Sequence, residues 1–346
     1  MKPGRRLAVA LATAAVLWPL AVTVAPATAA SHRGLPAQVY APYYETYLAP
    51  HTPSVSATAR ASGARYLTLA FLQSAGKHSC SINWNGNSSQ PLNYYAQDIA
   101  RLRAAGGDVI PSFGGYSADQ GGTEIADSCR SVSRIAAVYE LVIRTLHVTR
   151  LDMDVEANSL TNTAGINRRN EAIALTERWA AAHCIPLQVQ YTLPVEPSGL
   201  GTETGVLRNA IARGARVTSV NIMVFDYYLP GERLQNMGAD AISAAASTHR
   251  ELAALYPAWS AARLWNMLGM TLLPGIDDYP NLDEVTSLQN TQLMLRFAQV
   301  HHLNFLSIWA IQRDNGGCPG AHDSNTCSGI KQHTWAFSHL LEHFTG

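Results

Sequence analysis

The sequence predicts an α/β protein folded as a single (β/α)8 TIM barrel. Eight runs of apolar, β-branched and aromatic residues follow one another along the chain, as strands do. Most of these runs are separated by stretches with apolar residues at three- and four-residue intervals, which is typical of helices. Strand–helix repetition of this kind closes into a barrel. The alternative fold, a doubly wound open sheet, is disfavoured because no glycine-rich phosphate-binding turn follows the first run.

The expected elements alternate along the chain without a Ser-, Gly- or Pro-rich linker, which indicates one domain. The expected strands are 38–44, 65–72, 108–113, 148–156, 187–193, 217–226, 264–273 and 303–311. The expected helices include 95–105, 131–146, 167–182, 239–255 and 282–301.

The first thirty residues are expected to be a secretory signal peptide and not part of the fold. Basic residues open the chain, residues 7–24 are mainly apolar, and small residues at 27–30 offer a cleavage site. A membrane anchor is the alternative, but Pro19 interrupts the apolar span that an anchor needs. We therefore expect a leader at 1–30, a barrel at 31–346, and a secreted, extracellular protein with no stable membrane association.

The charge composition argues against a polyanionic ligand. The chain has 25 Lys and Arg against 25 Asp and Glu, and charged residues make up 14% of it. Nucleic acids bind to clustered Lys and Arg, which a balanced and sparsely charged chain does not provide. We expect a neutral ligand, no cofactor and a monomer.

The five cysteines are expected to form two disulfides, because exported proteins meet an oxidising environment. Cys318 and Cys327 flank a short loop, and Cys80 and Cys129 lie in two loops that follow predicted strands. The expected pairs are Cys80–Cys129 and Cys318–Cys327, which leaves Cys184 as a buried thiol at the end of a helix. Neither the cysteines nor the scattered histidines have zinc-ligand spacing, so no metal site is expected.

Three acids, Asp152, Asp154 and Glu156, occupy alternate positions of the fourth expected strand. A strand points such residues to one face, and the apolar residues between them to the other. Burying three unpaired carboxylates for stability alone is unfavourable. We interpret the row as chemistry, with one acid held protonated at neutral pH by its like-charged neighbours. The alternative is an exposed edge strand with polar alternation.

In a barrel of this class the site is built where the strands end, and several expected strands end in aromatic, acidic or small polar residues. Aromatic rings stack on the apolar faces of sugars, and carboxyl groups cleave glycosidic bonds. Each ring alone is also compatible with core packing, but the whole set favours a carbohydrate-binding cleft. The set includes Tyr43, Tyr44, Gln73, Ser112, Gly114, Tyr116, Asp154, Glu156, Phe225, Asp226, Tyr227, Tyr228 and Trp309.

These residues resemble the motifs of glycoside hydrolase family 18, the chitinases and endo-β-N-acetylglucosaminidases. Residues 152–156 are similar to the family's Asp-x-Asp-x-Glu motif on strand four, and residues 112–115 to its Ser-x-Gly-Gly motif on strand three. Residues 223–226 resemble the Met-x-Tyr-Asp motif of strand six, and Trp309 resembles the strand-eight tryptophan beneath the scissile bond. The matches follow the family order over nearly the whole mature chain.

Two positions depart from the family pattern. Thr149 stands where the family often has a further Asp before the strand-four motif. Phe225 replaces the usual Tyr and lacks the hydroxyl that hydrogen-bonds the acetamido oxygen, a loss of about 1 to 3 kcal/mol of transition-state stabilisation. Tyr191, Tyr227 and Tyr228 are the candidates for a replacement hydroxyl.

The resemblance implies substrate-assisted retention of configuration. Glu156 is then the general acid and base, Asp154 stabilises the 2-acetamido group whose oxygen attacks C1, and Asp152 shares a proton with Asp154. The implied substrate-binding residues are Trp309, Asp226, Tyr227, Phe225, Met223, Tyr191, Tyr43, Tyr44, Ser112 and Gly114.

The implied substrate is chitin, the β-1,4 polymer of N-acetylglucosamine, or its oligosaccharides. Hydrolysis of N-glycan cores and a noncatalytic chitin-binding lectin on the same barrel are alternatives. A divalent metal on the Asp-x-Asp pair, as in nucleotide-sugar transferases, is a third. The intact Glu156 disfavours the lectin, and export disfavours the transferase because no nucleotide donor is available outside the cell.

Overall fold

The structure is a computed structural model that describes residues 34–227, 236–278 and 284–345. The leader expected at 1–30 lies, apart from Met1, outside the described residues, as does Tyr228. Residues 34–346 form one unit, in agreement with the expected single domain. None of the described helices combines the length and hydrophobicity that a membrane span requires.

Closure of the barrel depends on a first strand that is split in two. β1 (Val39–Tyr40) pairs in parallel with the last strand, β12 (Phe305–Ile308), whereas β2 (Tyr43–Glu45) pairs in parallel with β3 (Tyr66–Ser74). Pro42, which has no N–H to donate, lies at the break between the two halves. Because residues 39–45 touch both ends of the sheet, the sheet closes on itself.

The other barrel strands pair in parallel in sequence order, and all eight predicted strands are present. Besides β1, β2, β3 and β12, the barrel strands are β5 (Asp108–Gly114), β6 (Arg150–Asp154), β7 (Gln188–Pro194), β8 (Ser219–Met223) and β9 (Leu268–Leu272). Two small additions are β4 (Ile82–Trp84), antiparallel to β3, and the pair β10 (Gly275–Ile276) and β11 (Val285–Thr286).

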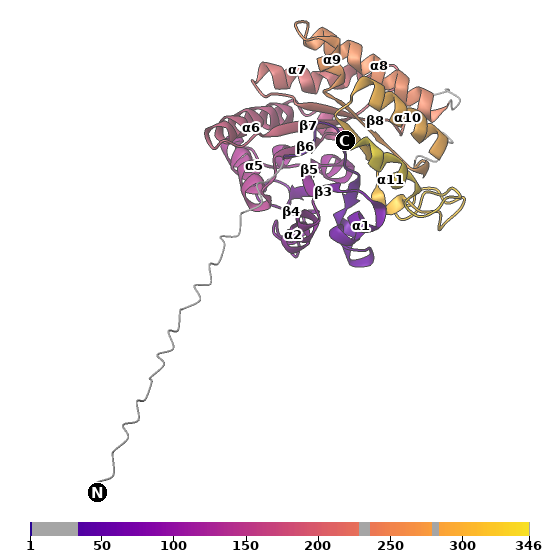
Figure 1. Ribbon diagram of the computed structural model, residues 1–346. Coiled ribbons are helices and arrows are strands. Elements are labelled where there is room, and N and C mark those ends of the chain that lie inside the picture. Colours follow the sequence, from indigo (N-terminus) through magenta and orange to yellow (C-terminus); the bar gives the residue numbers. More distant parts are fainter. Residues whose placement is uncertain (2–33, 228–235, 279–283, 346) are drawn as a thin grey trace. The chain divides into compact units, whose positions relative to one another are not determined.

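Helices surround the barrel in the described structure (Figure 1). The longer ones are α1 (Val55–Ser62), α2 (Ala96–Ala104), α5 (Val132–Leu146), α6 (Thr163–Ala182), α7 (Thr204–Ala212), α8 (Met237–Leu255) and α10 (Leu288–His301). Shorter ones are α3 (Tyr116–Gly121), α4 (Ile125–Ser128), α9 (Ala261–Trp265) and α11 (Ala336–Leu341). The 3-10 turns are η1 (Thr46–His51), η2 (Ala157–Leu160), η3 (Gly201–Glu203), η4 (Ile311–Arg313) and η5 (Glu342–Phe344).

Helix α10 begins later than the expected start at residue 282. A capping box at Ser287 and Asn290, in which each side chain accepts a hydrogen bond from the other residue's backbone N–H, sets its first turn. The helices α1 and α7 are not among the expected helices.

The barrel interior is layered. Val39, Ala41, Ile110 and Phe305 form an apolar cluster. A polar layer that includes Asp152 is also fully buried. The apolar residues of β6 point the other way and belong to the large core between sheet and helices. The acidic row therefore faces the barrel interior, and the alternative of an exposed edge strand is wrong.

Both predicted disulfides are present. Cys80–Cys129 joins the segment before β4 to the end of α4, and Cys318–Cys327 closes a loop after η4. The expectation that Cys184 is buried is wrong, because this residue is exposed. It follows α6 in a left-handed backbone conformation, beyond the part of the helix that packs on the barrel.

Removing the Cys80–Cys129 disulfide is expected to cost more stability than removing Cys318–Cys327. The pairs are separated by 49 and 9 residues, so chain entropy predicts losses of about 4 and about 3 kcal/mol, respectively. Urea unfolding of the two double Cys→Ser variants measures the difference, with Cys184→Ser as the control that should leave stability unchanged. Equal losses would contradict the loop-length argument.

Candidate active site

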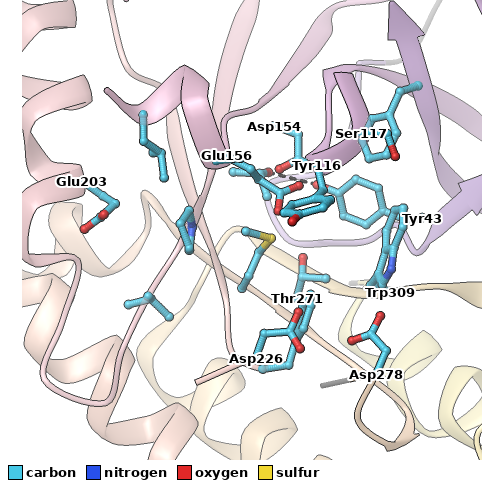
Figure 2. A pocket seen from close by; sticks show the side chains of 18 of the residues that line it. Tyr43, Tyr116, Ser117, Asp154, Glu156, Glu203, Asp226, Thr271, Asp278 and Trp309 are labelled. Atoms are coloured by element: carbon cyan, nitrogen blue, oxygen red, sulfur yellow. Dashed lines mark hydrogen bonds between the residues drawn. The ribbon is translucent and has the colours of Figure 1, made fainter. Parts of the chain in front are cut away.

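A cavity of about 1100 Å³ lies at the carboxyl ends of the barrel strands. Residues at the ends of several strands line it, among them Phe225. Figure 2 shows Tyr43, Asp154 and Trp309 in this lining. Its size is sufficient for several sugar units, since pockets for drug-sized ligands have volumes of roughly 300 to 1,000 Å³. The predicted cleft is thus present at the predicted end of the barrel.

Asp152 lies below the cleft and is completely buried. Its carboxylate accepts four hydrogen bonds, which come from residues on β2, β5 and β7. The donors are Tyr43 Oη (2.8 Å), Ser112 Oγ (2.6 Å), Gln190 Nε2 (3.0 Å) and Thr192 Oγ1 (2.7 Å). Burial raises the pKa of Asp152, and these donors oppose the rise because they stabilise the ionised form.

Asp154 lines the cleft two residues further along β6 and is 4% exposed. Its Oδ1 is buried without a hydrogen-bond partner within the described chain. Burial raises the pKa of Asp154 well above its usual range, and the charges of Glu156, Asp152 and Asp119 raise it further. A proton is therefore favoured on Asp154 while Asp152, with four donors, is better suited to remain ionised.

Glu156 follows the end of β6 and lies in the wall of the cleft. Burial raises its pKa to about 7, the neighbouring Asp278 carboxylate adds to the rise, and a hydrogen bond from the Tyr116 backbone opposes it. A carboxyl group with a pKa near neutrality can both donate and accept a proton under ordinary conditions. Its position and pKa suit a general acid and base.

The glycines at 114 and 115 let the chain pass close to β6. Gly114 has a φ of +93°, and a Cβ placed there would be 2.1 Å from the carbonyl oxygen of Asp154. Gly115 has a φ of +82°, a Cβ there would meet the Phe71 ring at 2.5 Å, and its N–H donates to the same Asp154 oxygen at 3.2 Å. The two glycines therefore connect the end of β5 to α3 at positions where a larger side chain would collide with its neighbours.

Trp309 and Phe71 form the aromatic floor of the cleft. Their rings are stacked, with centroids 5.5 Å apart, and the Tyr43 ring meets Trp309 edge-on at the same separation. Met223 and Phe225 extend this apolar surface on the other side of Trp309. Such a surface fits the apolar face of a sugar ring.

Five of the predicted binding residues do not line the cleft: Ser112, which donates to Asp152 below it, Gly114, Tyr44, Tyr191 and Tyr227. The Tyr44 hydroxyl donates to the Pro53 carbonyl, and the Tyr191 hydroxyl donates to Asn170 Oδ1 on α6. Both tyrosines, like Tyr227, belong to the core between sheet and helices. These expectations are wrong, and strand geometry explains why for Tyr191: it is in register with Met153, whose side chain faces the helices. Neither Tyr191 nor Tyr227 supplies the hydroxyl that Phe225 lacks.

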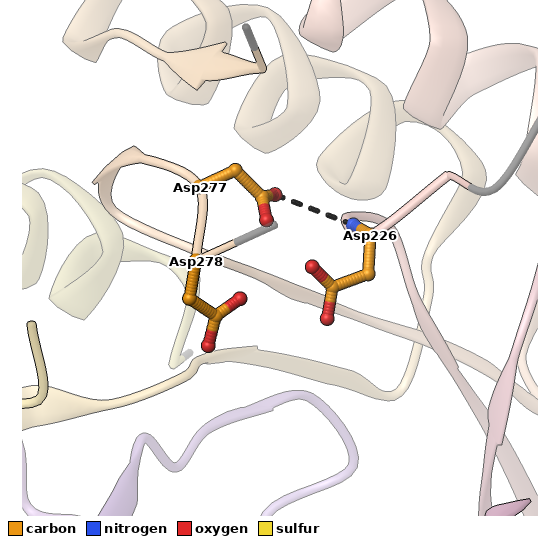
Figure 3. Close-up of side chains that lie close together, drawn as sticks. All are labelled: Asp226, Asp277 and Asp278. Carbon is orange, nitrogen blue, oxygen red and sulfur yellow. Dashed lines mark hydrogen bonds between the residues drawn. The ribbon is translucent and has the colours of Figure 1, made fainter. Parts of the chain in front are cut away.

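Asp226 shares its corner of the cleft with Asp277 and Asp278. One carboxylate oxygen of each lies within 4.8 Å of the others, and Asp277 accepts the main-chain N–H of Asp226 at 3.3 Å (Figure 3). Burial, followed by these two neighbours, raises the pKa of Asp226 to about 11. The cluster has the ligand types that a divalent cation takes. The buried guanidinium of Arg313 lies close enough to interact with all three charges, which offsets part of their repulsion.

Sequence reasoning missed several residues of the site. Tyr47, Phe71 and Asp278 line the cleft, and Asp119 accepts a hydrogen bond from the Glu156 backbone. These missed residues have no distinctive sequence context. Tyr116, at the end of the third expected strand, was anticipated and also lines the cleft.

Known proteins with similar sequences are chitinases. A probable bifunctional chitinase/lysozyme of Escherichia coli K12 is 32% identical over 322 residues, which cover 90% of this chain and 35% of the relative. Endochitinase 11 of Metarhizium anisopliae is 33% identical over 288 residues, which cover 81% of this chain and 53% of the relative. The chain thus spans about a third and about half of the lengths of these two proteins. No protein-family profile matches it.

Solved structures agree with the sequence relatives. Active domain 2 of the Pyrococcus furiosus chitinase, solved as catalytic-site mutants with chito-oligosaccharides, has a TM-score of 0.78 at 28% identity and covers 90% of this chain and 95% of that one. A family 18 chitinase from Cycas revoluta, with a TM-score of 0.59 and 11% identity over 89% of this chain and all of that one, shares the fold.

The described chain is thus a (β/α)8 barrel with an acidic cleft at the carboxyl ends of its strands. In sequence and in fold, the chain is similar to chitinases, including the catalytic domain of the Pyrococcus furiosus enzyme.

Proposed function

We propose that the protein hydrolyses β-1,4 bonds of chitin or chito-oligosaccharides by substrate-assisted, retaining catalysis. The single observation that carries this proposal is the placement of Asp154 and Glu156 side by side in the cleft, where none of the described lining side chains is basic. Within the described chain, Asp154 has a buried oxygen without a hydrogen-bond partner, and Glu156 has a pKa of about 7. The similar chitinases support chitin as the substrate.

In the proposed reaction, Glu156 protonates the glycosidic oxygen as the bond to C1 breaks. The oxygen of the substrate's own 2-acetamido group attacks C1 and forms a cyclic oxazolinium ion, so no protein nucleophile is needed. The proton that Asp154 carries before the reaction moves to Asp152, so Asp154 accepts the acetamido N–H as a carboxylate and balances the positive charge. Glu156 then takes a proton from a water molecule as the water oxygen attacks C1. This attack opens the oxazolinium ring and leaves a product with retained configuration.

Asp226 is the group we propose to replace the missing tyrosine hydroxyl of Phe225. Both residues line the cleft, and crowding with Asp277 and Asp278 favours the protonated form of Asp226. A protonated carboxyl group donates a hydrogen bond, as a tyrosine hydroxyl does. Asp226 then holds the acetamido oxygen in the direction from which it attacks C1.

We also propose that the protein is secreted and monomeric. The two disulfides support export, because such bonds persist mainly in oxidising compartments.

Glu156→Gln is expected to abolish hydrolysis and to retain oligosaccharide binding, since glutamine keeps the shape of the side chain but cannot donate the proton. Mass spectrometry of products from N-acetylglucosamine hexamer, with the wild type alongside, tests this. Release of shorter N-acetylated oligomers by the wild type alone establishes the activity, and cellohexaose is the control that neither protein should cut. Binding of the hexamer without cleavage by both proteins would favour a lectin instead.

The dependence of kcat/KM on pH is expected to show a decline above an apparent pKa of about 7, because the general acid must be protonated for the first step. Asp278→Asn removes a negative charge that raises the pKa of Glu156, so the decline should move to lower pH. Initial rates on a chromogenic chito-oligosaccharide across about pH 5 to 9 measure both effects. A shift to higher pH in the variant would refute the assignment of Glu156 as the titrating acid.

Asp226→Asn is expected to retain more activity than Asp226→Leu, because asparagine keeps a hydrogen-bond donor at this position and leucine does not. The loss in Asp226→Leu should be about 10- to 100-fold in kcat, the effect of one transition-state hydrogen bond. Steady-state kinetics on the same substrate measure kcat for the two variants. Equal losses in the two variants would show that the charge of Asp226 matters and not its ability to donate.

A further inference from the structure

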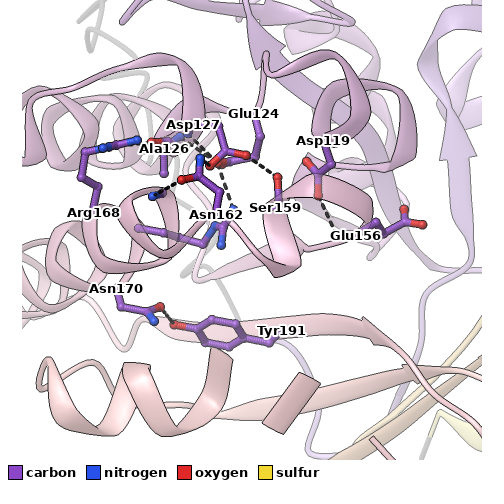
Figure 4. Close-up of polar contacts among 12 residues, drawn as sticks. Asp119, Glu124, Ala126, Asp127, Glu156, Ser159, Asn162, Arg168, Asn170 and Tyr191 are labelled. Atoms are coloured by element: carbon purple, nitrogen blue, oxygen red, sulfur yellow. Dashed lines mark hydrogen bonds and ion pairs between the residues drawn. The ribbon is translucent and has the colours of Figure 1, made fainter. Parts of the chain in front are cut away.

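A carboxyl group outside the strand-four motif lies directly behind Glu156. Asp119, on α3, is fully buried, and its Oδ2 accepts the main-chain N–H of Glu156 at 2.6 Å (Figure 4). The backbone of Tyr116, on the same helix, hydrogen-bonds the Glu156 side chain. The main chain and the side chain of Glu156 are thus both held by α3.

The N–H that Asp119 binds is the first one beyond the barrel ladder. Val155 still donates to the Thr192 carbonyl of β7 at 3.0 Å, whereas the chain turns away at Ala157, which has a φ of +42°. The sheet therefore gives no main-chain acceptor to Glu156. The conformation of the residue that carries the carboxyl group depends on a side chain from another loop.

Helix α3 is itself fixed to β6, so this hydrogen bond has a firm base. Gly115 donates to the Asp154 carbonyl, and the Asp119 N–H donates to the Gly115 carbonyl at 3.0 Å. The passage through Gly114 and Gly115 thus sets the distance between α3 and the end of β6.

Burying the Asp119 carboxyl group costs free energy, and the packing of the fold does not require a carboxyl group at this position. Its Oδ1 is buried without a hydrogen-bond partner in the described chain, and the nearby Glu124 carboxylate repels it. Arg169 on α6 reduces this cost, but its ion pair, at 3.0 Å, is with Glu124. A buried carboxyl with one direct hydrogen bond to the chain indicates a role in the site.

We propose that Asp119 is a positioning residue for Glu156: by accepting the Glu156 main-chain N–H, it fixes the turn at the end of β6 that directs the Glu156 carboxyl group into the cleft. This inference rests on the proposed role of Glu156. Loss of the bond lets the carboxyl group move relative to the glycosidic oxygen, which lowers kcat and leaves sugar binding on the aromatic floor intact.

The test compares Asp119→Ala with Asp119→Asn, whose amide oxygen can still accept the N–H. We expect Asp119→Ala to lower kcat by about 10- to 100-fold, with KM within about threefold of wild type, and Asp119→Asn to restore most of kcat. The matched control is Asp98→Ala, because Asp98 also accepts a main-chain N–H, from Ser56 at 3.0 Å, and does not line the cleft. It should lower the unfolding temperature and leave kcat unchanged.

Three results would overturn the inference while the wild type is active and Glu156→Gln is not. They are an unchanged kcat in Asp119→Ala, equal losses in the Ala and Asn variants, and a rise in KM in place of a fall in kcat. If circular dichroism shows that Asp119→Ala is unfolded, Asp119→Ser takes its place under the same criteria. A folded wild type that does not cleave the hexamer refutes the proposed function itself, and this inference with it.

Discussion

The four hydrogen bonds to Asp152 are the interaction on which the rest of the site depends. They join side chains from β2, β5 and β7 around one carboxylate of β6 at the centre of the barrel. A buried carboxylate is expensive unless its oxygens are satisfied, so the four strands must keep the register that places these donors. That register also fixes Asp154, two residues along the same strand, at the base of the cleft.

Burial and crowding of acids then set the protonation states. Three of the acids that line the cleft, Asp154, Glu156 and Asp226, each have a raised pKa, and burial is the first cause in every case. The neighbours differ, however. Glu156 is stabilised as an anion by a backbone hydrogen bond and titrates near neutrality, whereas Asp226 is crowded by two further acids. Differences in environment thus give identical functional groups different roles.

The loops after the strands hold the part of the site that the sheet does not reach. The barrel strands supply the floor and the acidic row, but Glu156 lies one residue past the ladder, and α3 takes over the contact with its backbone. The same division explains the choice of glycine at 114 and 115, since a Cβ at either position would collide with a part of the site. In this barrel, precision at the reacting group comes from a loop that is held against a strand.

The sequence by itself determined the eight strands, both disulfides, the acidic row and the cleft at the strand ends, because period-two alternation and strand-end composition are local properties. The sequence did not determine which of two adjacent side chains faces the barrel interior. Tyr43 faces the interior and Tyr44 faces the helices, and Tyr191 faces the helices because it is in register with Met153. Those choices depend on strand register. Only the tertiary structure shows that Asp119 and Asp278 lie near Glu156. Contacts between segments that are distant in the sequence produce no periodic pattern of residues.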